Sequence, residues 1–270
     1  MNFLFIILSF FALRAASPPD GPGTTRRYPI LGPAYESVTV RDRALRGAVF
    51  YIVAGHGGPD SGARGKRGDA TLCEDEYAYD VGLRLARRLL EHDARVYVII
   101  RDPDDGIRDD SLLLCDTDET AWGGASLPVD QLARLRQRSR IVNRLSRAHG
   151  QARYRRLIAL HVDSRSEGDR VDIFFYHHSQ SPAARRTARR LQSTIEQKYR
   201  AHQPWRGYRG TVAPRDELYM LRTTHPRTVY IELGNIRNPL DQRRFIEVDN
   251  RQALANWLAE GLLDDYRHSR

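Results

Sequence analysis

The sequence has few cysteines, few lysines and only one long apolar run. Two cysteines, Cys73 and Cys115, among 270 residues exclude a small disulfide-dense scaffold and a cysteine-rich zinc finger. Whether they pair stays open, because an oxidising compartment would join them and a cytosolic one would keep them reduced. A chain of this length buries a core without cross-links, so a bound metal would be expected to serve function rather than folding.

The one apolar run covers residues 3–13 and is followed by small residues up to Ser17. We expect a signal peptide over residues 1–16, although no Lys or Arg precedes the run, so an uncleaved anchor is the alternative. No second stretch is long enough to cross a bilayer. The mature chain is therefore expected to be soluble and exported, to the periplasm or the extracellular cell envelope.

Positive charge comes almost entirely from arginine, since Lys66 and Lys198 are the two lysines and the net charge is +9. Arginine forks favour polyanions such as nucleic acid, anionic lipid or an acidic cell-envelope polymer. Most single arginines, as on the predicted helices 134–156 and 183–200, belong to a solvated helix face. No helix-turn-helix, Cys/His finger or aromatic basic sheet motif is present, so we expect no nucleic-acid partner.

Strand and helix patterns alternate along the chain after a Pro/Gly-rich leader or linker over residues 17–45. Apolar runs at 47–54 and 95–100 predict buried strands, and a four-residue apolar spacing predicts a helix over 75–90. Further strands are expected at 156–162, 171–176 and 227–233, and helices at 129–149, 181–200, 239–247 and 250–266. This order predicts one α/β domain over residues 46–270, with a twisted, mostly parallel or mixed sheet flanked by helices on both faces.

Four residues of metal-site type lie at predicted strand ends or helix starts. His56 follows the first strand in a Gly-rich turn, Glu74 opens the first helix, and His161 and Glu232 end two later strands. In open α/β sheets these positions share one rim, where ligands bind. Two imidazoles and a carboxylate are the ligand set of catalytic zinc, and a second carboxylate would supply a general base.

Several motifs in order resemble the zinc-dependent N-acetylmuramoyl-L-alanine amidases of bacterial cell-wall metabolism. They cover about residues 47–265: Val53-Ala-Gly-His-Gly-Gly-Pro-Asp-Ser-Gly-Ala63, Glu74, Arg101-Asp102, Arg138 with Ile141-Val-Asn143, Leu160-His-Val-Asp163, Leu221-Arg222 and Tyr230-Ile-Glu-Leu-Gly-Asn-Ile-Arg-Asn238. The chain departs from the family pattern at Val53, Val142, Asp163 and Asn235, none of which matches a metal ligand.

The resemblance implies one Zn²⁺ per chain, held by His56, Glu74 and His161, with Glu232 as the catalytic carboxylate. Glu76 is a rival for the acidic ligand. His177 and His178 are set aside, because neighbours on a strand point to opposite faces.

The implied activity is hydrolysis of the amide between N-acetylmuramic acid and L-alanine of the stem peptide, with the peptidoglycan glycan strand and stem peptide as partners. Arg222, Arg138 and Asn143 are the candidate substrate-binding residues. Alternatively, the two arginines form structural ion pairs, and Asn143 is a helix residue without a role in binding. At the level of the whole protein, the alternative is a non-catalytic peptidoglycan-binding protein on the same fold.

A long insertion over about residues 102–128 leaves the predicted ligand rim. It is rich in acidic residues: Asp102, Asp104, Asp105, Asp109, Asp110, Asp116, Asp118 and Glu119. We expect either a surface loop or an acidic lid that excludes substrate or offers a fourth zinc ligand. A disulfide between Cys73 and Cys115 would pin such a lid over the metal, and an activator protein would be the partner that moves it.

Overall fold

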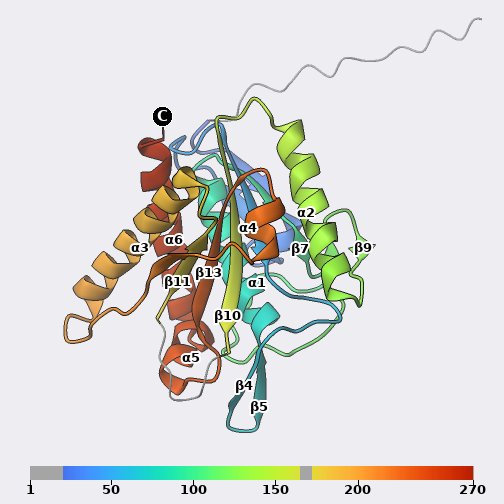
Figure 1. Ribbon diagram of the computed structural model, residues 1–270, viewed down its shortest axis with the longest axis vertical. Coiled ribbons are helices and arrows are strands. Elements are labelled where there is room, and N and C mark those ends of the chain that lie inside the picture. Colours follow the sequence, from blue (N-terminus) through green and yellow to red (C-terminus); the bar gives the residue numbers. More distant parts are fainter. Residues whose placement is uncertain (1–20, 165–171, 270) are drawn as a thin grey trace, which may run out of the picture.

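The computed structural model describes residues 21–164 and 172–269 (Figure 1). Its central six-stranded sheet has the order β12-β11-β13-β10-β3-β6. The strands are β3 (Ala48–Ala54), β6 (Arg95–Val98), β10 (Tyr154–Asp163), β11 (Phe174–His177), β12 (Val212–Pro214) and β13 (Arg227–Asn235). Strands β6, β3, β10 and β13 are parallel, whereas β11 runs antiparallel to β13. The predicted mixed, mostly parallel sheet is confirmed.

Helices cover both faces of this sheet, as predicted. They are α1 (Glu74–Glu91), α2 (Gln131–Ala148), α3 (Pro182–His202), α4 (Tyr219–Thr223), α5 (Pro239–Ile246) and α6 (Val248–Arg267). Side-chain caps begin three of them: Asp130 accepts from Ala133 N at α2, Ser181 precedes Pro182 at α3, and Asn238 precedes Pro239 at α5. Each cap satisfies backbone N–H groups that the first helical turn leaves open.

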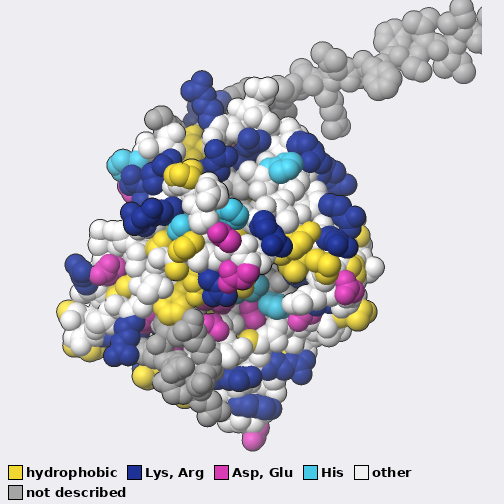
Figure 2. All heavy atoms as spheres, in the orientation of Figure 1, with side chains coloured by type: hydrophobic (Ala, Val, Ile, Leu, Met, Phe, Trp, Pro, Cys, Tyr) yellow, Lys and Arg dark blue, Asp and Glu magenta, His cyan; other side chains and the backbone are white. Residues whose placement is uncertain are grey.

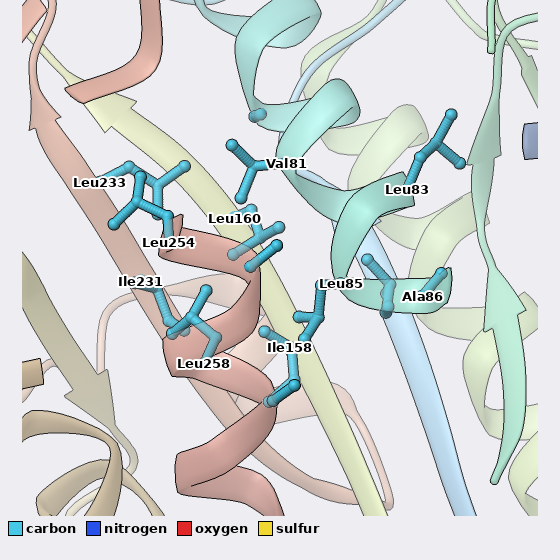
Figure 3. Packing of buried hydrophobic residues seen from close by; sticks show 14 of the residues in the cluster. Val81, Leu83, Leu85, Ala86, Ile158, Leu160, Ile231, Leu233, Leu254 and Leu258 are labelled. Atoms are coloured by element: carbon cyan, nitrogen blue, oxygen red, sulfur yellow. The ribbon is translucent and has the colours of Figure 1, made fainter. Parts of the chain in front are cut away.

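Alternate residues of β3 feed two hydrophobic cores. Phe50 and Ile52 belong to the core under α1, α3 and α6, while Tyr51 and Val53 belong to the core under α2 and α4. Figure 3 shows side chains of α1 and α6 pointing toward β10 and β13 in the first core. A strand buried on both faces needs a continuous apolar run, which is why β3 was readable from the sequence.

The leader expected over residues 17–45 is wrong for its described part. Residues 21–45 contain β1 (Thr25–Arg27), the 3₁₀ turn η1 (Pro29–Leu31) and β2 (Ser37–Thr39), and β1 pairs with β2. Leu31, Val38 and Leu45 are buried in the first core. This stretch is therefore part of the domain. The expected signal peptide, residues 1–16, lies outside the described residues, and no helix within the described ones is long and apolar enough to span a membrane.

Smaller strands complete the fold around the site. A hairpin of β4 (Arg64–Arg67) and β5 (Ala70–Cys73) leads into α1. A second small sheet joins β7 (Ile100–Arg101), β8 (Thr120–Ala121) and β9 (Ala125–Ser126). The long segment 102–128 thus leaves at β7 and returns to pair with it through β8.

Segment 102–128, for which a surface loop and an acidic lid were both open, packs along α1. Cys115 is disulfide-bonded to Cys73, and the Tyr77 hydroxyl lies between Ser111 O and Leu113 N at 3.3 and 3.2 Å. The fully buried Arg251 of α6 donates to the carbonyl oxygens of Arg108 and Asp110. These contacts bind the segment to α1 and α6 from several sides.

Candidate metal centre and substrate pocket

Three side chains of metal-ligand type converge at the carboxyl ends of the parallel strands. His56 follows β3, Glu74 is the first residue of α1, and His161 lies near the end of β10. Glu74 Oε1 is 2.9 Å from His161 Nδ1 and 3.5 Å from His56 Nε2. One ligand atom from each of the three lies within 4.8 Å of the other two. The structure brings these predicted residues together.

Two glycines make room for this convergence. A Cβ at Gly55 would lie 1.8 Å from the His161 ring, so no other residue fits there unless the histidine moves. Gly62 has φ of +69° and faces Glu74 Oε2, which a Cβ would approach to 2.5 Å. Glycine is required at Gly62 both for the left-handed backbone and for the close approach.

The Glu74 carboxylate is held by backbone donors and is ionised. Val162 N donates to Oε1 at 3.0 Å and Ala63 N to Oε2 at 2.7 Å. Burial opposes ionisation, but the His56 charge and the hydrogen bond from His161 outweigh it, so the pKa of Glu74 is lowered. Burial lowers the pKa of His161 to about 4. A carboxylate and a neutral imidazole are the forms that bind zinc, so the donor set fits the metal.

Asp60, which the sequence analysis did not single out, contacts the Nδ1 side of the His56 ring. Its Oδ2 lies 3.0 Å from His56 Nδ1 and accepts from Arg134 Nη2 at 2.7 Å. The His56 imidazole holds the pKa of Asp60 well below its usual range. A carboxylate on the second ring nitrogen orients a metal-binding histidine. The only signal in the sequence was an Asp four residues after the histidine.

Glu232 lies on β13 in register with His161 of β10. Side chains at paired positions of neighbouring strands project to the same face, so Glu232 lies on the same face of the sheet as His161. It is not part of the group whose ligand atoms converge, and it does not line the cavity described below. Tyr230, two residues earlier, stacks on the His161 ring with centroids 4.0 Å apart. Burial and the nearby carboxylates of Glu232 and Glu74 raise the pKa of Tyr230 well above its ordinary value.

A cavity of about 160 Å³ opens beside the two histidines. Its walls come from β3, β10, α2, α4 and Tyr230, and no residue of 102–128 lines it. Arg138 of α2 is 2% exposed and donates through Nη1 to Gly55 O. Its Nε and Nη2 are buried and have no hydrogen-bond partner among the described residues, and burial lowers its pKa to about 10. Arg138 therefore lines this cavity with two guanidinium donors that no described residue satisfies.

Comparison with known proteins identifies the family of this chain. A sequence model of the Amidase_3 family, N-acetylmuramoyl-L-alanine amidase, matches residues 50–264. The chain belongs to this amidase family. A search of curated proteins gave no significant match.

Solved amidase structures share the fold at low sequence identity. CwlD from Clostridioides difficile, solved in complex with the GerS lipoprotein, is 16% identical with a TM-score of 0.62, over 82% of this chain and 99% of that one. AmiC2 of Nostoc punctiforme is 19% identical with a TM-score of 0.57, over 83% and 99% of the two chains. Ami1 from Mycobacterium smegmatis is 17% identical with a TM-score of 0.59, over 83% and 99%.

Four further sequence candidates lie away from the ligand group of this amidase. Glu76 accepts from Asp116 N and from Arg108, so it faces segment 102–128 rather than the histidines. His177 and His178 belong to no converging ligand group within residues 21–164 and 172–269. Arg222 is exposed on α4 and does not line the cavity.

Asn143 does not reach the cavity either. Its amide donates to Thr223 O at 2.8 Å and accepts from His225 N at 2.7 Å. Both ends of the side chain are thus used to hold the end of α4 against α2. Because α4 forms one wall of the cavity, these two hydrogen bonds of Asn143 also fix the position of that wall.

The departures from the family pattern divide between the cavity and the core. Val53 lines the cavity, whereas Val142 is buried in the core under α2. Asp163 and Asn235 pair across β10 and β13 where the register shifts. Only Val53 therefore changes the wall that faces the metal centre.

Proposed function

We propose that this amidase hydrolyses the amide bond between N-acetylmuramic acid and L-alanine of the peptidoglycan stem peptide in a zinc-dependent reaction. The supporting observation is the convergence of His56, Glu74 and His161 beside an open cavity, with Glu232 on the strand position paired with His161. One zinc ion per chain would be held by these three residues. When bound, zinc supplies a Lewis acid that polarises the amide carbonyl and acidifies water.

Glu232 is proposed as the proton-transfer group. Its carboxylate takes a proton from the water that attacks the amide carbon and returns it to the alanine nitrogen. The C–N bond then breaks, which leaves a lactyl carboxylate on the sugar and a free amine on the peptide. A positioned general base of this kind contributes about 10²- to 10⁴-fold in rate.

Arg138 is proposed to bind the substrate, and its two open donors support this role. A buried guanidinium without a full set of partners is costly, and a substrate carboxylate or carbonyl in the cavity would complete it. Substrate binding by Arg222 also stays a proposal, and it would take place outside the cavity, because Arg222 is exposed on α4. For Asn143 we propose a positioning role, because its contacts are with the backbone at the end of α4 and just after it.

A non-catalytic peptidoglycan-binding protein on the same fold is the alternative, and digestion of purified sacculi separates the two. The protein should release free stem peptides and leave peptide-less glycan, and a chelator should stop the release. Binding to sacculi without release would favour the non-catalytic protein. Cut glycan strands or shortened peptides would reject the amidase bond assignment.

Export to the periplasm or extracellular envelope is proposed from the apolar run 3–13 and from the wall substrate. An activator acting on segment 102–128 is also a proposal. Its supports are the CwlD structure solved with a lipoprotein and two exposed leucines on the segment, Leu112 at 45% and Leu114 at 84%. Because the segment does not line the cavity, such a partner would act from outside α1.

A further inference from the structure

A basic hollow lies at the end of the sheet opposite the metal centre. Its volume is about 600 Å³, and it lies where β10, β13 and α3 begin. Five arginines and a histidine line it: Arg153, Arg155, Arg156, Arg186, Arg227 and His268. No carboxylate is among its lining residues. The surrounding sequence also carries charge of one sign, since residues 131–162 contain nine arginines and no Asp or Glu.

Three of these arginines carry uncompensated charge. Arg156 is paired with the buried Asp265, and Arg155 donates to the Ser146 carbonyl oxygen. Arg153, Arg186 and Arg227 are exposed and form no ion pair with any residue in the described part of the chain. Like charges around one hollow repel each other, so an anion bound there would be stabilised.

The basic residues continue beyond this hollow. A neighbouring hollow shares Arg153 and adds Arg46 and Arg95, and another shares Arg186 and adds Arg189. Each of these two hollows also has one carboxylate, Asp93 and Asp264, and each carboxylate is paired with an arginine outside the set named below, Arg26 and Arg190. We call Arg46, Arg95, Arg153, Arg186, Arg189 and Arg227 the basal arginine face. Figure 2 shows Lys and Arg side chains gathered over the upper part of the molecule, the end at which β10 and α3 begin in Figure 1. One small anion would fill one hollow, whereas this face spans three.

The described chain starts at the same end of the domain. Arg26, in the first described strand, lines the same hollow as Arg95 and Arg153. The apolar run 3–13 is separated from Gly21 by only seven residues, which reach about 25 Å when fully extended. A chain that meets a bilayer through this run therefore meets it with this end of the domain close by.

Binding at this face leaves the metal centre open. Strand β10 begins at Tyr154 beside the basic hollow and carries His161 at the metal centre. Seven residues of strand span about 23 Å, so the two sites lie at opposite ends of the sheet. A planar partner on the basal arginine face would hold the cavity pointing away from it.

We propose that the basal arginine face docks the domain onto an anionic phospholipid surface, with arginine forks binding lipid phosphates and the metal centre directed away from the bilayer. This proposal goes beyond the amidase activity and does not depend on it. Each basic residue near an anionic bilayer strengthens binding about fivefold, so neutralising three should weaken it about 100-fold.

Vesicle binding by the full chain tests this proposal. The protein is sedimented with phosphatidylcholine vesicles that contain or lack 30% phosphatidylglycerol. The test variant is Arg153→Gln/Arg186→Gln/Arg227→Gln. Its control, Arg136→Gln/Arg140→Gln/Arg209→Gln, removes the same charge from exposed arginines outside the basal arginine face. Residues 1–20 are common to all three proteins, so binding through them appears equally with neutral vesicles.

We expect binding that requires phosphatidylglycerol, falls with added salt, drops about 100-fold in the test variant and changes less than about threefold in the control. Both variants should show a cooperative urea unfolding transition like that of the wild type, which shows that they are folded, and any release of stem peptides from sacculi in solution should stay at the wild-type rate. Equal binding to both vesicle types, or equal losses in the two variants, would overturn the proposal. Binding of soluble tripolyphosphate without binding to vesicles would assign the hollow to a free phosphate compound and would also overturn it.

Discussion

Breaking the Cys73–Cys115 disulfide should destabilise the domain without activating it. Cys115→Ser is the suitable change, because Cys115 is exposed whereas Cys73 is fully buried and can remain as a small apolar side chain. The bridge closes a loop between residues 42 apart in sequence. Chain entropy for a loop of this length corresponds to about 4 kcal/mol in the free energy of unfolding.

The remaining contacts of segment 102–128 predict that it stays in place after the bridge is lost. Arg251 still binds the backbone of residues 108 and 110, and the Tyr77 hydroxyl still bonds to residue 113. Because the segment does not line the cavity, the rate of sacculus hydrolysis should change less than about twofold in the native state.

Urea unfolding of the variant and of the wild type, with and without reductant, measures the effect. The reduced wild type and Cys115→Ser should coincide, and both should lie about 4 kcal/mol below the oxidised wild type. A loss under about 1 kcal/mol would mean that the bridge does not restrain the segment. A severalfold rise in the rate of hydrolysis would show that segment 102–128 inhibits the enzyme, and would contradict a purely structural role for its packing on α1 and α6.

Three further changes test separate parts of the account. Glu232→Gln should keep zinc bound while turnover on sacculi falls about 10²- to 10⁴-fold; retained turnover would move proton transfer to another group. Arg138→Met should raise KM or lower kcat/KM about tenfold or more with zinc content unchanged, and unchanged kinetics would remove it from the substrate site. Burial raises the pKa of Asp102 to about 7, so its ionisation costs stability as pH rises from about 4 to 7. Asp102→Asn should therefore stabilise the domain more at pH 8 than at pH 4 in urea unfolding, and an equal effect at both pH values would contradict the buried-charge explanation.

The main elements were predictable because their patterns are local. Strands β3, β10 and β13 are apolar runs buried on both faces, and α1 carries apolar residues at four-residue steps. The short elements β4, β5, β12 and α4 were missed. They are 4, 4, 3 and 5 residues long, which is too short for a helical or strand periodicity to show in the sequence.

The packing of residues 21–45 and 102–128 could not be predicted for a related reason. Both look irregular in sequence, yet both pack on the core through distant residues. Arg251, which binds the backbone of residue 108, lies 143 residues away along the chain, and no local pattern predicts such a contact. A run of acidic residues predicts charge, but it does not predict which surface of the domain the run covers.

The candidate metal ligands were identified from their position at the sheet rim and from family motifs, but the residues that support them were not. Sequence spacing alone left Glu74 and Glu76 open as rivals. The helix start decides between them, because the first residue of α1 meets the histidines and Glu76 faces away. Asp60 and Arg134 were missed, since the bond between them joins a turn to a helix 74 residues later.

Zinc content and hydrolysis measured on one preparation test the central claim most directly. The full chain, its chelated form, the chelated form with zinc restored, and His161→Ala are assayed for bound zinc and for stem peptides released from sacculi. The account predicts about one zinc per chain, loss of release on chelation, recovery with zinc, and neither zinc nor release in His161→Ala. Release by the metal-free protein, or one bound zinc in His161→Ala, would contradict it.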